Sequence, residues 1–298
     1  MGRLTIQTNR GQVPLSNFVT LVPAPKTSVI KRIDGNRAVT IKSDLAPGAQ
    51  VSERLQALLA SDIKLPDNVN IKTAGESADQ QEAMTFLLGA FATAILLGVY
   101  PLLGAQWGRL GMMSTARPLA YAQFLLLLLS FLCLTWAFID HDFTVQYVAT
   151  NSNSLLPLQY RISAVWGAHE GSLLLWVLTL GGWTAAVALF SRRLPLDAVA
   201  RVLGVLGLIS VGFTAFVLFT SDPFTRTLPY FPVDGRDLNP LLQDPGLIFH
   251  PPMLSMGYVG FSVAFAFAIA SLMTGRLDAT WARWSRPWTM AAWVFLTL

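Results

Sequence analysis

Three histidines are the residues of this chain best suited to bind a metal or to move a proton. A neutral imidazole ligates a metal ion, including the iron of a haem, through either ring nitrogen. A histidine at a membrane interface that bonds only to a backbone carbonyl is the simpler alternative for each of them. They are His141, His169 in Trp166-Gly-Ala-His-Glu-Gly-Ser172, and His250 in Gly246-Leu-Ile-Phe-His-Pro-Pro252.

Among the three histidines, His250 has the neighbouring residues that most favour a role as a metal ligand. The following Pro251 disfavours the α conformation at His250, and a Pro-Pro pair is typical of a helix start. We therefore expect a helix to begin here and to hold the imidazole at its entrance. His169 precedes Glu170, which suits a histidine oriented by a carboxylate or an acid–base pair. A hydrolase is not favoured, because no HExxH spacing is present and Ser172 cannot easily converge with its neighbours in a triad.

Aromatic and basic side chains accompany these histidines. Trp166 and Phe249 stand beside two of them in the sequence, and a flat apolar ligand such as a porphyrin needs walls of this kind. The aromatic belt of a membrane protein is the alternative explanation. Arg226 and Arg236 could pair with the carboxylates of such a ligand, although exposed charges in turns are more often only solvated.

Five apolar runs predict that the second part of the chain spans a membrane. Of the 298 residues, 53% are hydrophobic and 13% are charged, about half of the roughly 25% that is typical of soluble domains. Each run is close to the roughly 20 apolar residues that cross a bilayer, and none has an acidic or basic residue in its interior. The runs are Met84–Gly104, Pro118–Ile139, Ser172–Phe190, Val202–Thr220 and Pro252–Gly275, and Pro287 starts a sixth.

The first 83 residues differ in composition, because all lysines precede residue 84 and all nine tryptophans follow it. Their polarity pattern predicts strands at 12–21 and 37–44 and a helix at 52–59. We therefore expect a mainly α-helical polytopic membrane protein, with about five complete transmembrane helices and the start of a sixth in residues 84–298. A small N-terminal α/β domain is expected in residues 1–83. The single cysteine, Cys133, excludes an internal disulfide.

The arginines of the connecting loops predict the orientation of the helices. The loops after the first, third and fifth runs carry more arginines than the opposite loops, which indicates that they face the cytoplasm. The three histidines are then expected on the outer side, the periplasm of a Gram-negative cell. The basic residues form no patch, so no nucleic-acid partner is expected. The first group is Arg109, Arg117, Arg192, Arg193, Arg201, Arg276, Arg283 and Arg286, and the second is Arg161, Arg226 and Arg236.

An ordered set of motifs extends from about residue 98 to residue 298. They are Asn151-Ser-Asn-Ser-Leu-Leu-Pro157, Trp166-Gly-Ala-His-Glu-Gly-Ser172, Gly235-Arg-Asp-Leu-Asn-Pro240, Gly246-Leu-Ile-Phe-His-Pro-Pro252 and Trp281-Ala-Arg-Trp-Ser-Arg-Pro-Trp288. This set resembles the large subunit of the cytochrome c-type haem lyase, the CcmF/NrfE family of cytochrome c assembly proteins.

The resemblance implies a role in cytochrome c-type biogenesis in the bacterial inner membrane. Haem would be taken from a haem chaperone at the periplasmic face and attached to apocytochrome c, together with other maturation subunits. His250 would be one of two outward histidines that hold the iron of haem b. His169 matches the family's WGxHEGS segment and would have a structural or site-supporting role. From their residue types, Trp166, Phe249 and Arg236 are expected to complete the cofactor site. The family's second outward histidine and its Trp-rich loop are expected after residue 298.

The front of the chain resembles a second family. Gly11-Gln-Val-Pro-Leu-Ser-Asn-Phe-Val-Thr20, Arg32-Ile-Asp-Gly-Asn-Arg-Ala-Val-Thr-Ile41 and Ala74-Gly-Glu-Ser-Ala-Asp-Gln-Gln81 are similar to the porter domain of an AcrB-like resistance-nodulation-division (RND) efflux transporter, over about residues 1–96. We therefore interpret the chain as a fusion of two pieces. The alternative functions are a fragment of a proton-driven transporter, which requires a titratable residue within a span, and an inactive truncated fusion.

Overall fold

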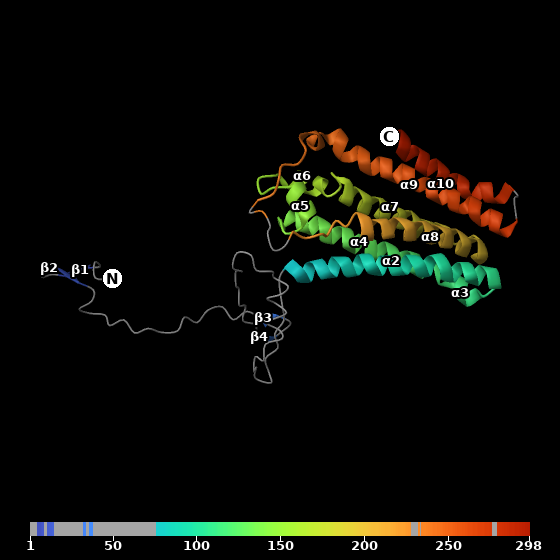
Figure 1. Cartoon of the computed structure of the whole chain (residues 1–298), viewed down its shortest axis with the longest axis horizontal. Helices are drawn as coiled ribbons and strands as arrows, with labels where there is room; N and C mark the ends of the chain where they lie inside the picture. The colour runs from blue at the N-terminus through green and yellow to red at the C-terminus, as the bar shows by residue number, and fades with distance from the viewer. Residues whose placement is uncertain are drawn as a thin grey trace. The chain divides into compact units, whose positions relative to one another are not determined.

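Long helices that lie side by side form the membrane part of the computed structural model (Figure 1). The structure describes residues 5–8, 11–14, 32–33, 36–37, 76–227, 232, 234–275 and 279–298. Its segments long and apolar enough to cross a bilayer are Glu82–Trp107, Leu110–Ile139, His169–Phe190, Leu196–Thr220 and Pro245–Thr274. The expected helical, polytopic membrane fold is therefore confirmed for this part of the chain.

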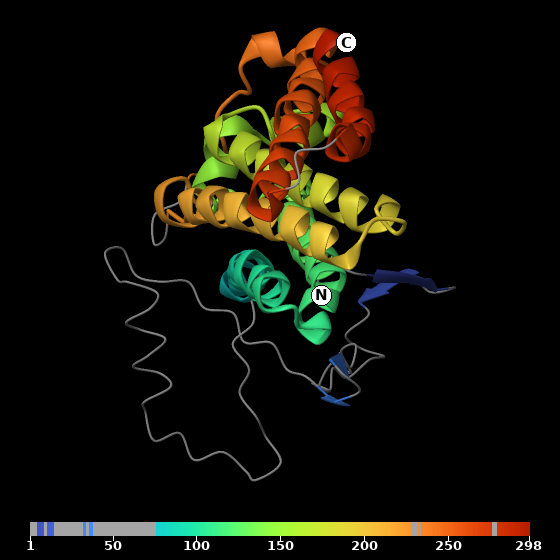
Figure 2. The same ribbon diagram turned by 90° about the vertical axis from the view of Figure 1, so that its right-hand side faces the viewer.

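The long helices are α2 (Glu76–Trp107), α4 (Ala116–Ile139), α7 (His169–Phe190), α8 (Leu196–Thr220), α9 (Pro245–Thr274) and α10 (Ala279–Thr297). The connections contain α3 (Leu110–Ser114), α5 (Gln146–Asn151), α6 (Leu158–Ala164) and the 3-10 helix η2 (Pro240–Gln243). Helix α2 packs against α4 and α8, α7 packs against α4, α8 and α9, and α10 packs against α9 (Figure 2). The sixth run, which starts at Pro287, lies within α10, whose helix begins earlier at Ala279.

Glycines allow α2 and α8 to approach closely. A Cβ atom at Gly207 would lie 2.6 Å from the backbone nitrogen of Gly98, which is too close for any side chain. One turn earlier, a Cβ atom at Gly204 would lie 2.5 Å from Cγ of Leu102. Small residues of this kind let the backbones of membrane helices touch, where apolar burial supplies little driving force.

Two short hairpins are described in the first part of the chain. Strand β1 (Thr5–Thr8) pairs antiparallel with β2 (Gly11–Pro14), and β3 (Arg32–Ile33) pairs antiparallel with β4 (Asn36–Arg37). The strand expected at 12–21 begins within β2, and the one expected at 37–44 meets β4 only at its first residue. The remainder of both, and the helix expected at 52–59, lie outside the described residues, so the α/β domain stays a prediction.

Successive long helices alternate in direction, so the bundle has two ends (Figure 1). We call the end that carries α5, α6 and the starts of α7 and α9 the histidine end, because His141, His169 and His250 all lie there. The arginines of the first group lie at the opposite end, except Arg276, which is outside the described residues.

Two of these arginines bind carbonyls near helix C-termini. Arg117 donates to the carbonyl oxygens of Ala188 and Ser191 at 3.3 and 3.1 Å, where α7 ends. Arg201 donates to the carbonyl of Ala105 at 3.2 Å, in the last turn of α2. Cations at these positions satisfy carbonyls that have no partner within the helix and complement the helix dipole.

Candidate functional site

The loop before α7 is built around the hydroxyl group of Tyr147 in α5. Its oxygen accepts a hydrogen bond from the backbone nitrogen of Ala168 at 3.1 Å and donates to the carbonyl of Val165 at 3.1 Å. Burial raises the pKa of Tyr147, so the hydroxyl stays protonated and remains a donor. A Cβ atom at Gly171 would lie 1.7 Å from the same Val165 oxygen. These contacts fix the start of α7, of which His169 is the first residue.

His169 is exposed and is held by a residue that follows α8. Its Nδ1 atom lies 3.0 Å from the hydroxyl oxygen of Ser221. Within the described residues, no hydrogen bond or ion pair joins it to Glu170, which instead lies in the first turn of α7, where a carboxylate complements the helix dipole. The ring is therefore oriented by a hydroxyl group and not by the neighbouring carboxylate.

Helix α9 begins at Pro245, well before His250, so the expected helix entrance at Pro251 is wrong. Asp244 caps this earlier start, because its Oδ1 atom accepts from the backbone nitrogen of Gly246 at 2.8 Å. Pro245 takes the first helical position, where its missing N–H removes no bond. His250 consequently lies in the second turn of a formed helix.

His250 heads an exposed apolar stripe on α9. Leu254 and Tyr258 follow at intervals of four residues, which places them on the same face, and they are 39% and 62% exposed. The adjacent Phe249 is 65% exposed. In the part of the chain that the structure describes, the His250 side chain makes no hydrogen bond or ion pair. A free imidazole beside an apolar wall is therefore available to a ligand.

Trp166 joins the two histidine-containing motifs. Its indole nitrogen donates to the carbonyl oxygen of Ile248 in α9 at 3.1 Å. This bond brings Trp166 to the helical turn that carries Phe249 and His250, whereas His169 is held separately by Ser221.

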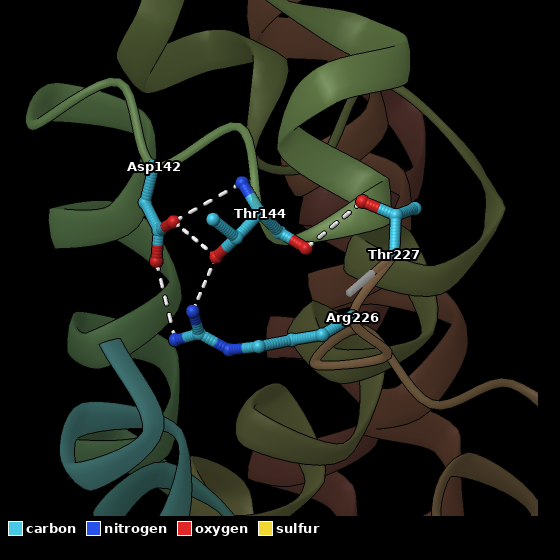
Figure 3. A network of polar contacts seen from close by, with 4 residues as sticks. All are labelled: Asp142, Thr144, Arg226 and Thr227. Atoms are coloured by element: carbon cyan, nitrogen blue, oxygen red, sulfur yellow. Dashed lines mark hydrogen bonds and ion pairs between the residues drawn. The ribbon is translucent and has the colours of Figure 1, made fainter. Parts of the chain in front are cut away.

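A buried network ties the segment after α8 to the loop after α4 (Figure 3). The Nη2 atom of Arg226 lies 3.2 Å from Oδ2 of Asp142, and its Nη1 atom donates to the hydroxyl of Thr144. The carbonyl of Thr144 accepts from the backbone nitrogen and the hydroxyl of Thr227 at 3.0 and 3.3 Å. Arg226 is thus engaged within the protein, and Asp142 and Thr144 are residues of this end that sequence reasoning missed.

The backbone of Arg236 is hydrogen-bonded within the protein, whereas its side chain is exposed. Its backbone nitrogen donates to the carbonyl of Ala149 at 2.8 Å, and the exposed guanidinium has no partner among the described residues. The preceding Asp234 accepts from the backbone and hydroxyl of Ser154 at 2.9 and 2.7 Å. The hydroxyl bond in particular lowers the pKa of Asp234 below its ordinary value of 3.8. Of the two arginines considered for ligand carboxylates, Arg236 is the available one.

His141 has a structural role at the end of α4. Its Nε2 atom lies 2.8 Å from Nη1 of Arg161, which also donates to the carbonyl of Ile139 at 2.9 Å. Because a guanidinium only donates, Nε2 of His141 must be the acceptor. His141 is therefore engaged by Arg161 through Nε2, whereas its Nδ1 atom is buried without a hydrogen-bond partner among the described residues.

Two family models match the chain. Residues 166–298 match the model described as "Cytochrome C assembly protein", which includes His169, His250 and helices α7 to α10. Residues 1–115 match the AcrB/AcrD/AcrF family, and this match extends through α2 and α3. Both resemblances expected from the sequence are confirmed.

Curated relatives and a solved structure agree with the first match. The cytochrome c-type biogenesis protein CcmF of Escherichia coli (strain K12) is 66% identical over 70% of this chain and 32% of that protein. The cytochrome c-type biogenesis protein ccl1 of Rhodobacter capsulatus is 55% identical over 71% of this chain and 32% of its own length. A structure titled "Cytochrome c Heme Lyase CcmF" superposes with a TM-score of 0.65 and 30% identity, over 78% of this chain and 36% of that one.

The chain spans about a third of the length of the curated relatives it matches. Helices α7 to α10 and the motifs with His169 and His250 lie within the residues that match the cytochrome c assembly model. The chain is therefore similar to the cytochrome c assembly proteins over residues 166–298, and over 70% of its length it is a homologue of about a third of CcmF.

Proposed function

We propose that this chain binds and handles haem at the histidine end during cytochrome c-type biogenesis, with His250 as an axial ligand of the iron. The observation that carries the proposal is the position of His250, which is exposed and unpartnered among the described residues at the head of an apolar stripe. Homology to proteins named for cytochrome c-type biogenesis supports the same function.

The residues present fit haem b, which is the cargo in this proposal. An imidazole ligates the iron, and apolar side chains bind the porphyrin face. Leu254 and Tyr258 lie about 6 and 12 Å further along the helix axis than His250, at 1.5 Å per residue, and so provide a continuous wall. Arg236 supplies a free guanidinium for a propionate. The indole of Trp166 bonds to the turn of α9 that carries Phe249, and His169 is a further imidazole of this end.

The arginine distribution supports an orientation for the bundle. With the arginine-rich end in the cytoplasm, the histidine end faces the periplasm across the inner membrane. A haem chaperone, apocytochrome c and other maturation subunits would then approach the chain from that side. Haem attachment itself is the activity we propose for the assembled system, to which this chain contributes a haem-binding end.

A proton-driven transporter is not supported by the described helices. In the five candidate spans, the acidic, basic and histidine side chains lie only near helix ends, at Glu82, Arg117, His169, Glu170, Asp197, Arg201 and His250. Proton relays need ionisable groups within the membrane.

An absorption spectrum of the detergent-purified chain, expressed with a supply of haem, tests the proposal. We expect a Soret band that is lost in His250→Ala and retained in Leu247→Ala, an exposed apolar neighbour on the same helix. A band that survives His250→Ala unchanged, or no band in the parent chain, would contradict the proposal.

A further inference from the structure

We propose that Trp166 is a positioning residue for His250. Its indole N–H replaces the backbone donor that Pro252 lacks, and this bond fixes the second turn of α9 to the segment before α7. We call this bond from Trp166 to Ile248 the clamp. Its effect on haem binding rests on the proposed function, whereas its effect on the structure of α9 does not.

The carbonyl of Ile248 is the polar group that requires this donor. In an α-helix it would accept from the backbone nitrogen of residue 252, but Pro252 has no N–H and its ring crowds the same carbonyl. The bond to Ile248 lies in a partly buried position, and carbonyls that are shielded from water are almost always paired in folded proteins. The indole nitrogen of Trp166, at 3.1 Å, supplies the missing bond.

Trp166 is itself fixed by packing, so its bond to Ile248 fixes the position of that turn of α9. Its ring packs against the buried core of the histidine end, which includes Val165 and Tyr147. The adjacent Gly167 lies so close to η2 that a Cβ atom there would be 2.9 Å from Leu242. His250 follows Ile248 by two residues, and the orientation of its turn is therefore set by a fixed point outside α9.

A second indole bond to α9, donated from α7, provides an internal control. The indole nitrogen of Trp183 donates to the carbonyl of Met256 at 3.0 Å. Residue 260, which would donate to Met256 within the helix, is a glycine and keeps its backbone N–H. The bond from Trp183 is thus an additional one, whereas the bond from Trp166 is a substitute for a missing one.

Hydrogen–deuterium exchange of the full chain in detergent, without haem, tests the clamp. We expect Trp166→Phe to accelerate amide exchange at residues 246–250 about tenfold, as for the loss of one hydrogen bond, and to leave α2 and α8 unchanged. Trp183→Phe should not affect residues 246–250. Unchanged exchange in Trp166→Phe, or equal acceleration by both variants, would overturn the proposal.

Replacing Pro252 tests directly whether the indole N–H of Trp166 takes the place of the missing backbone N–H. Pro252→Ala restores a backbone N–H for Ile248, so the Trp166→Phe/Pro252→Ala double variant should recover the protection of residues 246–250. If protection is not recovered, Trp166 does not act by replacing that donor.

Titration with haemin tests whether the clamp positions His250. His250→Ala should abolish the Soret shift, and Trp166→Phe should raise the haemin concentration at half-saturation of that shift severalfold. The Trp166→Phe/Pro252→Ala double variant should still bind haemin more weakly than the parent. Its Ile248 carbonyl has a backbone donor again, but α9 is not bonded to residue 166. Parental binding in the double variant would overturn the positioning role. If the parent chain shows no shift that depends on His250, the proposed function fails, and the exchange experiment alone decides the clamp.

Discussion

Arg226 and Asp142 form an ion pair of 3.2 Å between Nη2 and Oδ2, and their side chains are only 6% and 15% exposed. The pair joins two connections that are far apart in the sequence. Removing one partner of a buried pair leaves the other charge without compensation. We therefore expect Arg226→Ala to reduce the free energy of unfolding by about 3–5 kcal/mol, measured by thermal unfolding in detergent.

Arg236→Ala is the matched control for this variant, because its guanidinium is exposed and unpaired among the described residues. Its effect should remain within about 0.5 kcal/mol, as for most surface substitutions. Equal losses in the two variants would show that the network in Figure 3 does not stabilise the histidine end.

Gly171 should not tolerate even the smallest side chain. An alanine Cβ would overlap the Val165 carbonyl oxygen at 1.7 Å and approach the Tyr147 hydroxyl to 2.6 Å. We expect Gly171→Ala to cost about 1–3 kcal/mol or more through overpacking. Gly182→Ala, in the same helix, meets its nearest atom at 3.7 Å and should be neutral or stabilising by up to about 1 kcal/mol. Similar unfolding temperatures for both variants would contradict this interpretation.

Asp222 should make stability depend on pH, because burial raises the pKa of its carboxyl group above the ordinary 3.8. The folded protein therefore holds this proton more tightly than the unfolded chain, and stability falls as the pH rises from 3.8 through the raised pKa. Asp222→Asn keeps an oxygen for the backbone nitrogen of Phe224 and removes the partly buried charge. The variant should unfold at a higher temperature than the parent at pH 7, and the difference should vanish towards pH 4.

Asp234→Asn should change the unfolding temperature at pH 7 in the direction opposite to Asp222→Asn. The hydrogen bonds from Ser154 lower the pKa of Asp234, so its ionised form stabilises the fold above pH 3.8 and this contribution is lost as the pH falls through the lowered value. Asp234→Asn should therefore unfold at a lower temperature than the parent at pH 7. If both aspartate variants shift in the same direction, these pKa assignments are wrong.

Arg236 should contribute to haem affinity through charge. Arg236→Gln is expected to weaken haemin binding up to about tenfold at low salt and less at high salt, because exposed charges are screened. Arg193→Gln, at the opposite end of the bundle, is the control and should leave the titration unchanged. A salt-independent effect of Arg236→Gln would exclude pairing with a propionate.

The membrane helices were predictable because apolar length alone identifies a span. The conformational preference of a residue before proline predicts the start of α9 too late, because the capping signal lies further upstream. Asp244 followed by Pro245 is a typical helix start, and this pair in the sequence could have located it. Packing of α9 against α7 and α10 then holds Pro251 and Pro252 within the helix.

The contacts of the site were less accessible to sequence reasoning than its residues. The importance of His250 could be inferred from its motif and from the family resemblance. The pairing of Arg226 with Asp142 and the bond from Trp166 to Ile248 could not, because residues about eighty positions apart meet only through the packing of several helices. A single sequence contains no signal for such pairs.

The two residues joined by the bond between Trp166 and Ile248 are synthesised in a fixed order. Its donor and acceptor are 82 residues apart, and the donor comes first in the chain. During synthesis, Trp166 therefore leaves the ribosome before the carbonyl that needs it and before Pro252 removes the alternative donor. The donor that replaces the missing N–H of Pro252 is therefore already present when the turn of α9 that carries His250 is synthesised.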